Sequence, residues 1–161
     1  MNRTQNILFV GLGGQGILKA SEIATVALFN HGYEVKQSEV HGMSQRGGSV
    51  TSEVRFGPEV HSPLIPKGAV DFLVAMQADE GERYRDQVRD GGVFLTIADC
   101  LEEAVGPDVM ANTVMLGRLA ARLDVPKEVW LGAFDECLKP KFREVNHRSF
   151  TVGRAFEGRR R

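Results

Sequence analysis

The sequence predicts an α/β fold: a three-layer α/β/α sandwich with a Rossmann-like mixed sheet that is mostly parallel and contains an antiparallel hairpin. The chain opens with an apolar run at 6–10, a glycine-rich turn, a helical pattern that ends at Asn30 and a second strand-like run at 34–40. Strand–helix–strand units of this kind form parallel sheets covered by helices. Residues 49–57 instead alternate apolar and polar side chains, which is typical of a half-exposed strand rather than a central parallel one.

The remaining elements are predicted from apolar periodicity and turn residues. A turn at 56–59 allows residues 60–62 to pair back on the preceding strand as a short hairpin partner. Further along, the sequence predicts a buried strand over 70–76, a charged surface helix over 78–89, a strand over 93–98, a short helix over 99–105, a helix over 111–123 and a helix that starts at Pro126.

Length and charge limit the classes of function. The 161 residues suit a single domain, 1–161, and the formal net charge of −1 gives no electrostatic reason to expect nucleic acid or a membrane surface as a partner. No apolar run reaches the roughly 18 residues that suggest a membrane span. Residues 1–11 lead straight into a strand without a signal-peptide pattern. We therefore expect a cytoplasmic protein.

The two cysteines, Cys100 and Cys137, are far apart and form no C-x-x-C pair, zinc pattern or iron–sulfur ligand set. Isolated cysteines in apolar surroundings are typical of buried free thiols. The sequence therefore predicts no metal site in this chain. If the chain belongs to a redox enzyme, the iron–sulfur clusters lie on another chain.

The first glycine-rich turn places Gly11, Gly13 and Gly16 at the G-x-G-x-x-G spacing, between a strand and a helix. There, glycines permit a tight turn and close backbone approach, and the helix N-terminus attracts anions. Glu39 stands where the ribose-binding acid of a dinucleotide site is expected. Gln15 argues against such a site, because its amide can occupy the donors that a pyrophosphate needs. Two roles for this turn therefore remain open: binding NAD or FAD in a reductase, or packing and docking without a cofactor.

A second glycine-rich loop, HGMSQRGGS at 41–49, follows where a dinucleotide domain would normally continue with a short loop and a helix. Arg46 beside Gly47 and Gly48 can present a guanidinium and backbone amides to a phosphate or carboxylate. As a histidine, His41 belongs to the residue class that can act as a general base. Since no Ser, Cys or Asp is placed to complete a relay with it, we predict no catalytic residue. An ordinary surface loop with a solvated arginine is the alternative.

Three stretches, in this order and spacing, resemble the small subunit of 2-oxoacid:ferredoxin oxidoreductases: VGLGGQGILKASEIA, SEVHGMSQRGGSVTSEVRFG and VHSPLIPKGAVDFLVA. The sequence is most similar to the beta subunit of indolepyruvate ferredoxin oxidoreductase. That subunit is equivalent to the gamma subunit or domain of the pyruvate and 2-oxoisovalerate enzymes. The resemblance covers most of the chain, including NTVMLGRLAA and VNHRSFTVG.

The resemblance implies an oxidoreductase subunit that is not active alone. In this family, a 2-oxoacid is decarboxylated with thiamine diphosphate and Mg, iron–sulfur clusters carry electrons to ferredoxin, and coenzyme A takes up the acyl group. The larger thiamine- and iron–sulfur-containing subunit holds these cofactors. The resemblance implies that this chain binds none of them alone and docks on the larger subunit near the thiamine and coenzyme A region.

The family's pattern also implies which residues contact a partner or ligand: Gly11, Gly13, Gly14, Gln15, Gly16, His41, Gly42, Gln45, Arg46, Gly47, Gly48 and Ser49. We expect the two loops to meet at the carboxyl ends of the first two strands, the usual ligand crevice of an open α/β sheet. Arg46 is expected to contact an anionic group of the partner or of coenzyme A. Pro63 and Pro66 are expected to stiffen an interface segment.

The chain departs from the family pattern at DCLEEAVGPDVMA, 99–111, which replaces a longer stretch in the indolepyruvate group. We therefore expect one strand and its loop to be missing. The substrate stays open between indolepyruvate, another aryl pyruvate and other 2-oxoacids. A non-catalytic assembly module, which orders the active site of its partner, is a further alternative.

Overall fold

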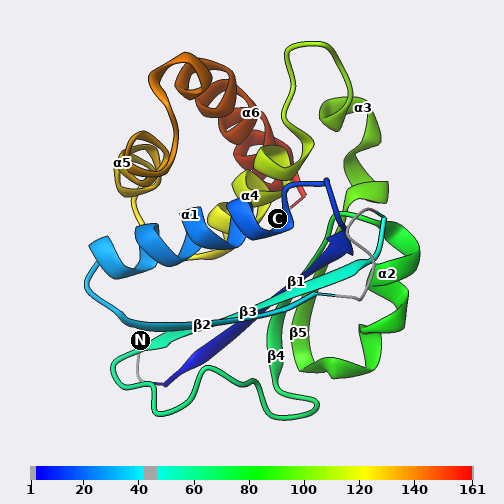
Figure 1. Cartoon of the computed structure of the whole chain (residues 1–161), viewed down its shortest axis with the longest axis vertical. Helices are drawn as coiled ribbons and strands as arrows, with labels where there is room; N and C mark the ends of the chain where they lie inside the picture. Colours follow the sequence, from blue (N-terminus) through cyan, green and yellow to red (C-terminus); the bar gives the residue numbers. More distant parts are fainter. Residues whose placement is uncertain (1–2, 42–46, 161) are drawn as a thin grey trace.

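A computed structural model describes residues 3–41 and 47–160 of the chain. These residues form an α/β fold with a mixed sheet and helices on both of its faces (Figure 1). The strands are β1 (Gln5–Leu12), β2 (Glu34–His41), β3 (Ser49–Gly57), β4 (Val70–Ala75) and β5 (Val88–Thr96). The helices are α1 (Ile17–Asn30), α2 (Ala78–Arg83), η1 (Arg85–Gln87), η2 (Ile97–Cys100), α3 (Leu101–Ala104), α4 (Ala111–Arg122), α5 (Lys127–Cys137) and α6 (Pro140–Arg159). The predicted fold class is confirmed.

The strand order in the sheet is β2-β3-β1-β4-β5. β1 and β4 pair in parallel, as do β4 and β5, whereas β3 runs antiparallel to both of its neighbours, β1 and β2. The antiparallel hairpin is therefore β2–β3. The prediction that residues 60–62 pair with the strand at 49–57 is wrong, because both edges of β3 are already occupied and 60–62 form no strand.

The alternation in β3 has the predicted meaning. Val50, Val54 and Phe56 are buried against the helix layer, and Ser52 in the same alternating set is buried too. Thr51, Glu53 and Arg55 are half-buried on the opposite face. In contrast, all six residues of β4 are buried, as its mainly apolar composition predicts, and Asp71 is the one charged residue among them. The sheet thus passes from a fully covered centre to a half-exposed antiparallel side.

The two faces of the sheet are covered unequally. α1, α4, α5 and α6 form a thick layer over one face, and α2 lies on the other (Figure 1). The larger hydrophobic core lies between the sheet and the thick layer and contains Trp130, Phe134 and Phe150, each fully buried. A smaller cluster around Leu8 and Leu73 lies on the face of α2.

The charged surface helix predicted over 78–89 is shorter than expected. α2 ends at Arg83, and after η1 the chain enters β5 at Val88, which pairs with Val70 of β4. Gly91 and Gly92 therefore lie inside β5, beside a register shift, instead of ending a helix. Pairing with β4 prevails here over the charged, helix-like composition of the segment.

The longest described helix, α6, follows the last element that the sequence predicts. It packs closely on α4 through two glycines. A Cβ on Gly153 would lie 1.9 Å from the carbonyl oxygen of Val114, and one on Gly117 would lie 2.2 Å from that of Phe150. Among the described residues, no helix is long and apolar enough to cross a membrane.

Candidate functional site

The described ends of the two glycine-rich loops lie together at the carboxyl end of β1. The backbone N–H of Gly13 donates to the carbonyl of Gly48 at 2.9 Å, and Leu12, at the end of β1, pairs with Ser49, the first residue of β3. Since β3 is antiparallel, its start lies at the carboxyl edge of the parallel strands, where open α/β sheets bind ligands. Hereafter this region is called the carboxyl edge.

The first loop uses its glycines for backbone geometry and packing. Gly14 and Gly16 have φ values of 93° and 76°, which disfavour residues with a side chain. Gly16 precedes α1, and a Cβ there would lie 2.4 Å from the side-chain nitrogen of Asn112. A Cβ on Gly11 would lie 2.5 Å from the Ile17 side chain. Gly14 has no heavy atom within 4 Å of the position that a Cβ would take, so this glycine faces open space.

Gln15 does not fill the donors of the helix N-terminus, contrary to the expectation above. Its side-chain oxygen accepts from the backbone N–H of Leu12 at 2.8 Å, and its nitrogen donates to the side-chain oxygen of Gln77 at 3.2 Å. Gln15 therefore ties the end of β1 to the segment that follows β4.

The second loop is attached to α2 by a buried carboxylate. The Ser49 hydroxyl donates to Glu80 Oε2 at 2.6 Å, and Arg83 donates to Glu80 Oε1 at 2.8 Å. Glu80 is only 6% exposed. Glu80 is not among the predicted site residues, because it stands in a charged segment whose composition is typical of a solvated helix face. Its burial follows from the position of the start of β3, for which the local sequence contains no signal.

Several predicted site residues lie outside the described part of the chain. His41 ends β2, but its side chain is not described, and neither are Gly42, Gln45 and Arg46. Gly47 has a φ of 70° and leads through Gly48 into β3. The roles assigned to these residues in partner or ligand contact stay predictions.

A cleft of about 260 Å³ opens at the carboxyl edge between the first loop and the start of α4. Asn112 closes one side by donating to the carbonyl of Gly16 at 3.2 Å. The lining residues are Gly14, Gln15, Met76, Ile97, Val109, Met110, Ala111 and Asn112. None of them is titratable, so this cleft has the chemistry of a contact or binding surface and supplies no acid–base group.

The sheet order argues against a dinucleotide site at the first loop. In a dinucleotide-binding fold the acid that holds the ribose comes from the strand beside β1. Here β3 lies between β1 and β2, which moves Glu39 two strand spacings, about 10 Å, away from β1. The Glu39 carboxylate instead accepts from Gln37 Nε2 at 3.0 Å. The G-x-G-x-x-G spacing therefore serves a turn in a different topology.

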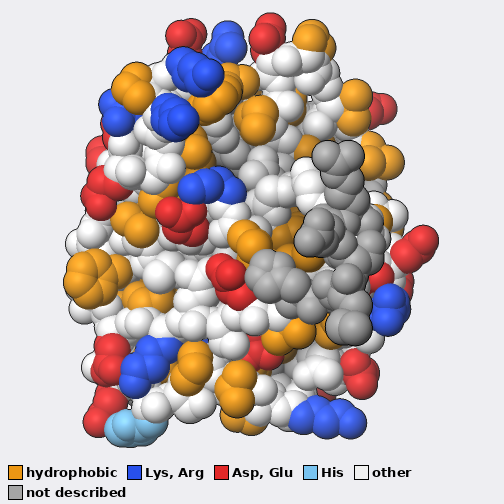
Figure 2. Space-filling view, viewed as in Figure 1, with side chains coloured by type: hydrophobic (Ala, Val, Ile, Leu, Met, Phe, Trp, Pro, Cys, Tyr) orange, Lys and Arg blue, Asp and Glu red, His pale blue; other side chains and the backbone are white. Residues whose placement is uncertain are grey.

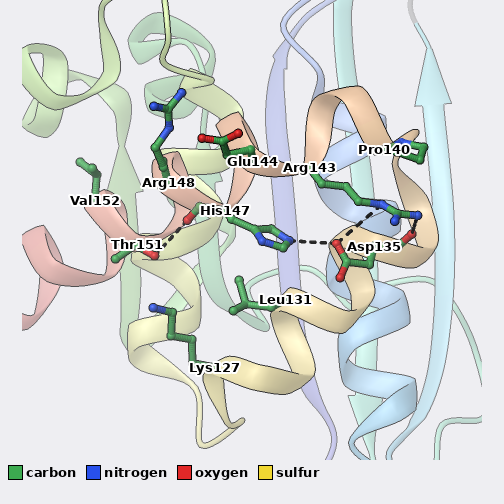
Figure 3. A pocket seen from close by; sticks show the side chains of 10 residues that line it. All are labelled: Lys127, Leu131, Asp135, Pro140, Arg143, Glu144, His147, Arg148, Thr151 and Val152. Carbon is green, nitrogen blue, oxygen red and sulfur yellow. Dashed lines mark hydrogen bonds and ion pairs between the residues drawn. The ribbon is translucent and has the colours of Figure 1, made fainter.

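A second hollow lies between α5 and α6, on the thick helix layer (Figure 3). It has a volume of about 790 Å³ and an apolar floor that includes Leu131 and Val152. Beside it, His147 Nε2 lies 3.1 Å from Asp135 Oδ1, and Arg143 donates to the Asp135 carbonyl at 2.7 Å. These contacts join α5 to α6. We call this hollow the α5–α6 groove.

A buried ion cluster connects β5, α4 and α6. The side chain of Arg118 is 2% exposed, and it donates to Glu157 at 2.8 Å and to the Thr96 carbonyl at 2.7 Å. Burial raises the pKa of Glu157, but hydrogen bonds from Arg118 and Arg122 outweigh it and hold that pKa below its ordinary value. This cluster is structural, because it lies under α6 and its groups satisfy one another.

The cysteines and segment 63–66 lie away from the loops' contact. Cys100 is buried and Cys137 is half-buried, and both are free thiols whose pKa is raised by burial. Among the described residues, no group of three or more His, Cys, Asp or Glu side chains is placed to hold a metal ion. Pro63 and Pro66 lie between the end of β3 and the start of β4, at the opposite edge of the sheet.

Relatives of two kinds match this chain. The indolepyruvate oxidoreductase subunit IorB of Thermococcus kodakarensis is 43% identical over 93 residues, which are 58% of this chain and 46% of that protein. The chain thus spans about half the length of this relative. The 2-oxoglutarate synthase subunit KorC of Methanocaldococcus jannaschii is 29% identical over an alignment that covers 92% of this chain and 91% of that protein.

Solved structures share the fold over nearly the whole chain. The gamma subunit of a keto/oxoacid ferredoxin oxidoreductase from Geobacter sulfurreducens superposes with a TM-score of 0.77 at 26% identity, covering 96% of this chain and 99% of that one. A 2-oxoglutarate:ferredoxin oxidoreductase from Magnetococcus marinus has a TM-score of 0.80 at 17% identity, and the match covers 99% of this chain but 32% of that one. The second match shows the fold alone.

The family model described as pyruvate ferredoxin/flavodoxin oxidoreductase matches residues 6–103, from β1 into α3. This match includes both glycine-rich loops, the buried Glu80 and the strands that bring them together. The chain belongs to the pyruvate ferredoxin/flavodoxin oxidoreductase family.

Proposed function

We propose that this chain is the small, gamma-type subunit of a 2-oxoacid:ferredoxin oxidoreductase, acting as a single domain over residues 1–161. The observation that carries the proposal is the match to a gamma subunit, which covers 96% of this chain and 99% of that subunit. In the proposed reaction a 2-oxoacid loses carbon dioxide, its electrons pass to ferredoxin, and the acyl group is bonded to the sulfur of coenzyme A.

The described residues do not fit the family's thiamine diphosphate, Mg or iron–sulfur clusters. Magnesium with a diphosphate needs carboxylate or carbonyl ligands, and clusters need several cysteines. The cleft at the carboxyl edge is lined by residues without charge, and the two cysteines are free and far apart in the chain. We therefore assign these groups to a larger partner subunit and derive no step through them.

In the proposed complex, this chain contributes a contact surface at the carboxyl edge. The bond between Gly13 and Gly48 holds the two loops side by side, and Gln15 fixes the first loop to the end of β1. Arg46 in the second loop is proposed to contact an anionic group of the partner or of coenzyme A, since a guanidinium binds phosphate and carboxylate bidentately. The Magnetococcus marinus enzyme was solved with coenzyme A bound.

The substrate class within this proposal is a 2-oxoacid. Indolepyruvate is favoured by the identity of 43% to IorB, and 2-oxoglutarate by the coverage of 91% of KorC. Oxidation rates with indolepyruvate, 2-oxoglutarate and pyruvate would decide between them.

The test is co-purification of the tagged full chain from its own cells, followed by 2-oxoacid-dependent reduction of a viologen dye. We expect a larger chain with thiamine and iron–sulfur clusters to accompany the tag, and dye reduction only when both chains are present. A protein that emerges alone and binds NAD saturably, with weaker binding in Gly13→Val, would show that the dinucleotide reading is correct. If the larger chain still assembles and reduces the dye at the full rate after this chain is removed, this chain is not a required subunit.

A further inference from the structure

An exposed ridge of apolar and acidic residues borders the carboxyl edge. It consists of Leu101, Glu102, Val105, Asp108 and Met110, in α3 and the segment that leads to α4. Its apolar members are exposed: Leu101 54%, Val105 70% and Met110 39%. Figure 2 shows hydrophobic and acidic side chains next to one another at the upper right, over α3 and the segment after it. We call these five residues the ridge.

The exposure of the ridge is not explained by the packing of α3. The same segment has other residues that anchor it to the core, because Cys100 is 1% exposed and Ala104 is 7% exposed. The apolar side chains of the ridge are therefore additional to those that the fold needs. Clustered exposed apolar side chains with polar neighbours are characteristic of interaction sites.

The charge of the ridge is one-sided. Residues 97–110 contain Asp99, Glu102, Glu103 and Asp108 and no lysine or arginine. Two of these carboxylates pair with arginines of α6: Asp99 Oδ2 lies 4.0 Å from Arg160 Nη1, and Glu103 Oε1 lies 4.0 Å from Arg159 Nη2. Glu102 and Asp108 have no ion pair within the described part of the chain. The outward-facing charge is thus negative, which complements a surface that carries lysine or arginine.

The ridge is continuous with the proposed contact surface of the two loops. Met110 belongs to the ridge and also lines the cleft whose opposite wall is formed by Gly14 and Gln15. In Figure 1, α3 stands on the same side of the molecule as the carboxyl end of β1 and away from α5. A partner that covers the loops therefore meets the ridge next.

We propose that the ridge docks on the larger thiamine- and iron–sulfur-containing subunit, in an apolar depression rimmed by lysine or arginine. This inference rests on the proposed function, which supplies the partner, and it extends the contact surface beyond the two loops. Leu101, Val105 and Met110 are the anchors, since apolar side chains at the centre of an interface supply most of its affinity. Glu102 and Asp108 act at the rim, where charges govern association rate and salt dependence.

The test compares variants of the tagged full chain in co-purification from its own cells. Val105→Asp and Leu101→Asp place a charge in the proposed apolar contact, and each should lower the amount of larger chain recovered per tagged chain by about tenfold, the loss typical of an interface anchor. The double variant Glu102→Lys, Asp108→Lys should also lower recovery of the larger chain, and the loss should grow as the salt concentration falls. At low salt, the repulsion between the new lysines and the lysine or arginine of the partner is not screened. Thermal unfolding of each isolated variant should match the unmodified chain, since all these side chains are exposed.

Two variants outside the ridge are the matched controls. Val152→Asp changes a residue that is 40% exposed in the α5–α6 groove, and Phe29→Asp changes one that is 67% exposed at the end of α1. Both should retain full recovery. Loss of recovery in Val152→Asp instead of the ridge variants would place the partner in the α5–α6 groove and overturn the proposal.

The remaining outcomes are distinguishable. Full recovery of the larger chain with Val105→Asp and Leu101→Asp overturns the ridge as a docking site and leaves the proposed function standing. A change in self-association on gel filtration, with recovery unaltered, assigns the ridge to a second copy of this chain and also overturns the proposal. If no thiamine- and cluster-containing chain co-purifies with the unmodified protein, that result overturns both the proposed function and this inference.

Discussion

Glu80 shows how much one buried side chain contributes to the position of the second loop. Its two oxygens accept from different elements, one from Ser49 at the start of β3 and the other from Arg83 on α2. Together with the bond from Gly13 to Gly48, this places the end of the loop between β1 and α2. A buried acceptor that loses its donor costs about 1–3 kcal/mol, so the contact is a strong local constraint.

We predict that Glu80→Ala lowers the free energy of unfolding by about 1–2 kcal/mol and speeds amide hydrogen exchange at residues 48–50. Glu80→Gln keeps an acceptor for Ser49 and should have a smaller effect. Glu82→Ala is the control, because the Glu82 side chain is 58% exposed and, within the part of the chain that the structure describes, bonds only to Arg85. Equal exchange in Glu80→Ala and Glu82→Ala would show that Glu80 does not hold the loop.

The close packing of α4 on α6 depends on two glycines, which have no side chain at the contact. Gly117 and Gly153 face each other's helix so closely that a Cβ at either position would overlap backbone atoms. Backbone cannot rotate away as a side chain can, so the helices would have to separate. The same helix pair encloses Arg118 and Glu157, whose ion pair requires the present spacing.

Gly153→Ala should therefore lower the free energy of unfolding by about 3 kcal/mol, the upper range for overpacking a core. Gly132→Ala is the matched control in α5. A Cβ there would meet nothing within 4 Å, and replacing a helical glycine by alanine stabilises by about 0.5–1 kcal/mol. Urea unfolding of both variants measures the difference. Equal stabilities of the two variants would contradict close backbone packing of α4 on α6.

At the scale of the whole molecule, two buried carboxylates connect stability to pH. Burial raises the pKa of Asp71, but hydrogen bonds from Arg3, Arg89 and the Asn6 backbone outweigh it and keep that pKa below its ordinary value. The pKa of Glu157 is lowered in the same way by Arg118 and Arg122. Each group therefore stabilises the fold above its unfolded pKa of about 4, and this contribution disappears as pH falls through the lower folded pKa.

We predict that the thermal midpoint decreases as pH falls from neutral to below about 4. Glu157→Gln should lower stability at neutral pH by about 3 kcal/mol, because it leaves the buried charge of Arg118 without its main partner, and should reduce the slope with pH. Asp71→Asn should reduce the slope as well. Thr151→Ala, which adds and removes no titratable group on α6, is the control. A slope in Glu157→Gln equal to that of the unmodified chain would contradict this account.

Local sequence was sufficient for most elements and for the character of the first loop. The glycines of VGLGGQG predicted a tight turn, and in that turn Gly14 and Gly16 have left-handed backbone. The limits of β3 were predicted from side-chain alternation alone. α6 was not predicted, since its buried face carries Asn146, Ser149, Gly153 and Glu157 with Phe150 as the single large apolar residue. Apolar periodicity is a weak signal for a helix that is buried through polar and small residues.

The sequence by itself determined the α/β class, the turn at the first glycine loop and the motifs of the family, because backbone preference and apolar periodicity are properties of neighbouring residues. The tertiary structure alone decided that β3 enters between β1 and β2, which separates Glu39 from the first loop, and that α2 stops at Arg83 so that Val88 can pair with β4. It also decided the burial of Glu80 and the exposure of the ridge. Strand order and burial depend on contacts between residues far apart in the chain. The energies of these contacts cannot be predicted from neighbouring residues alone.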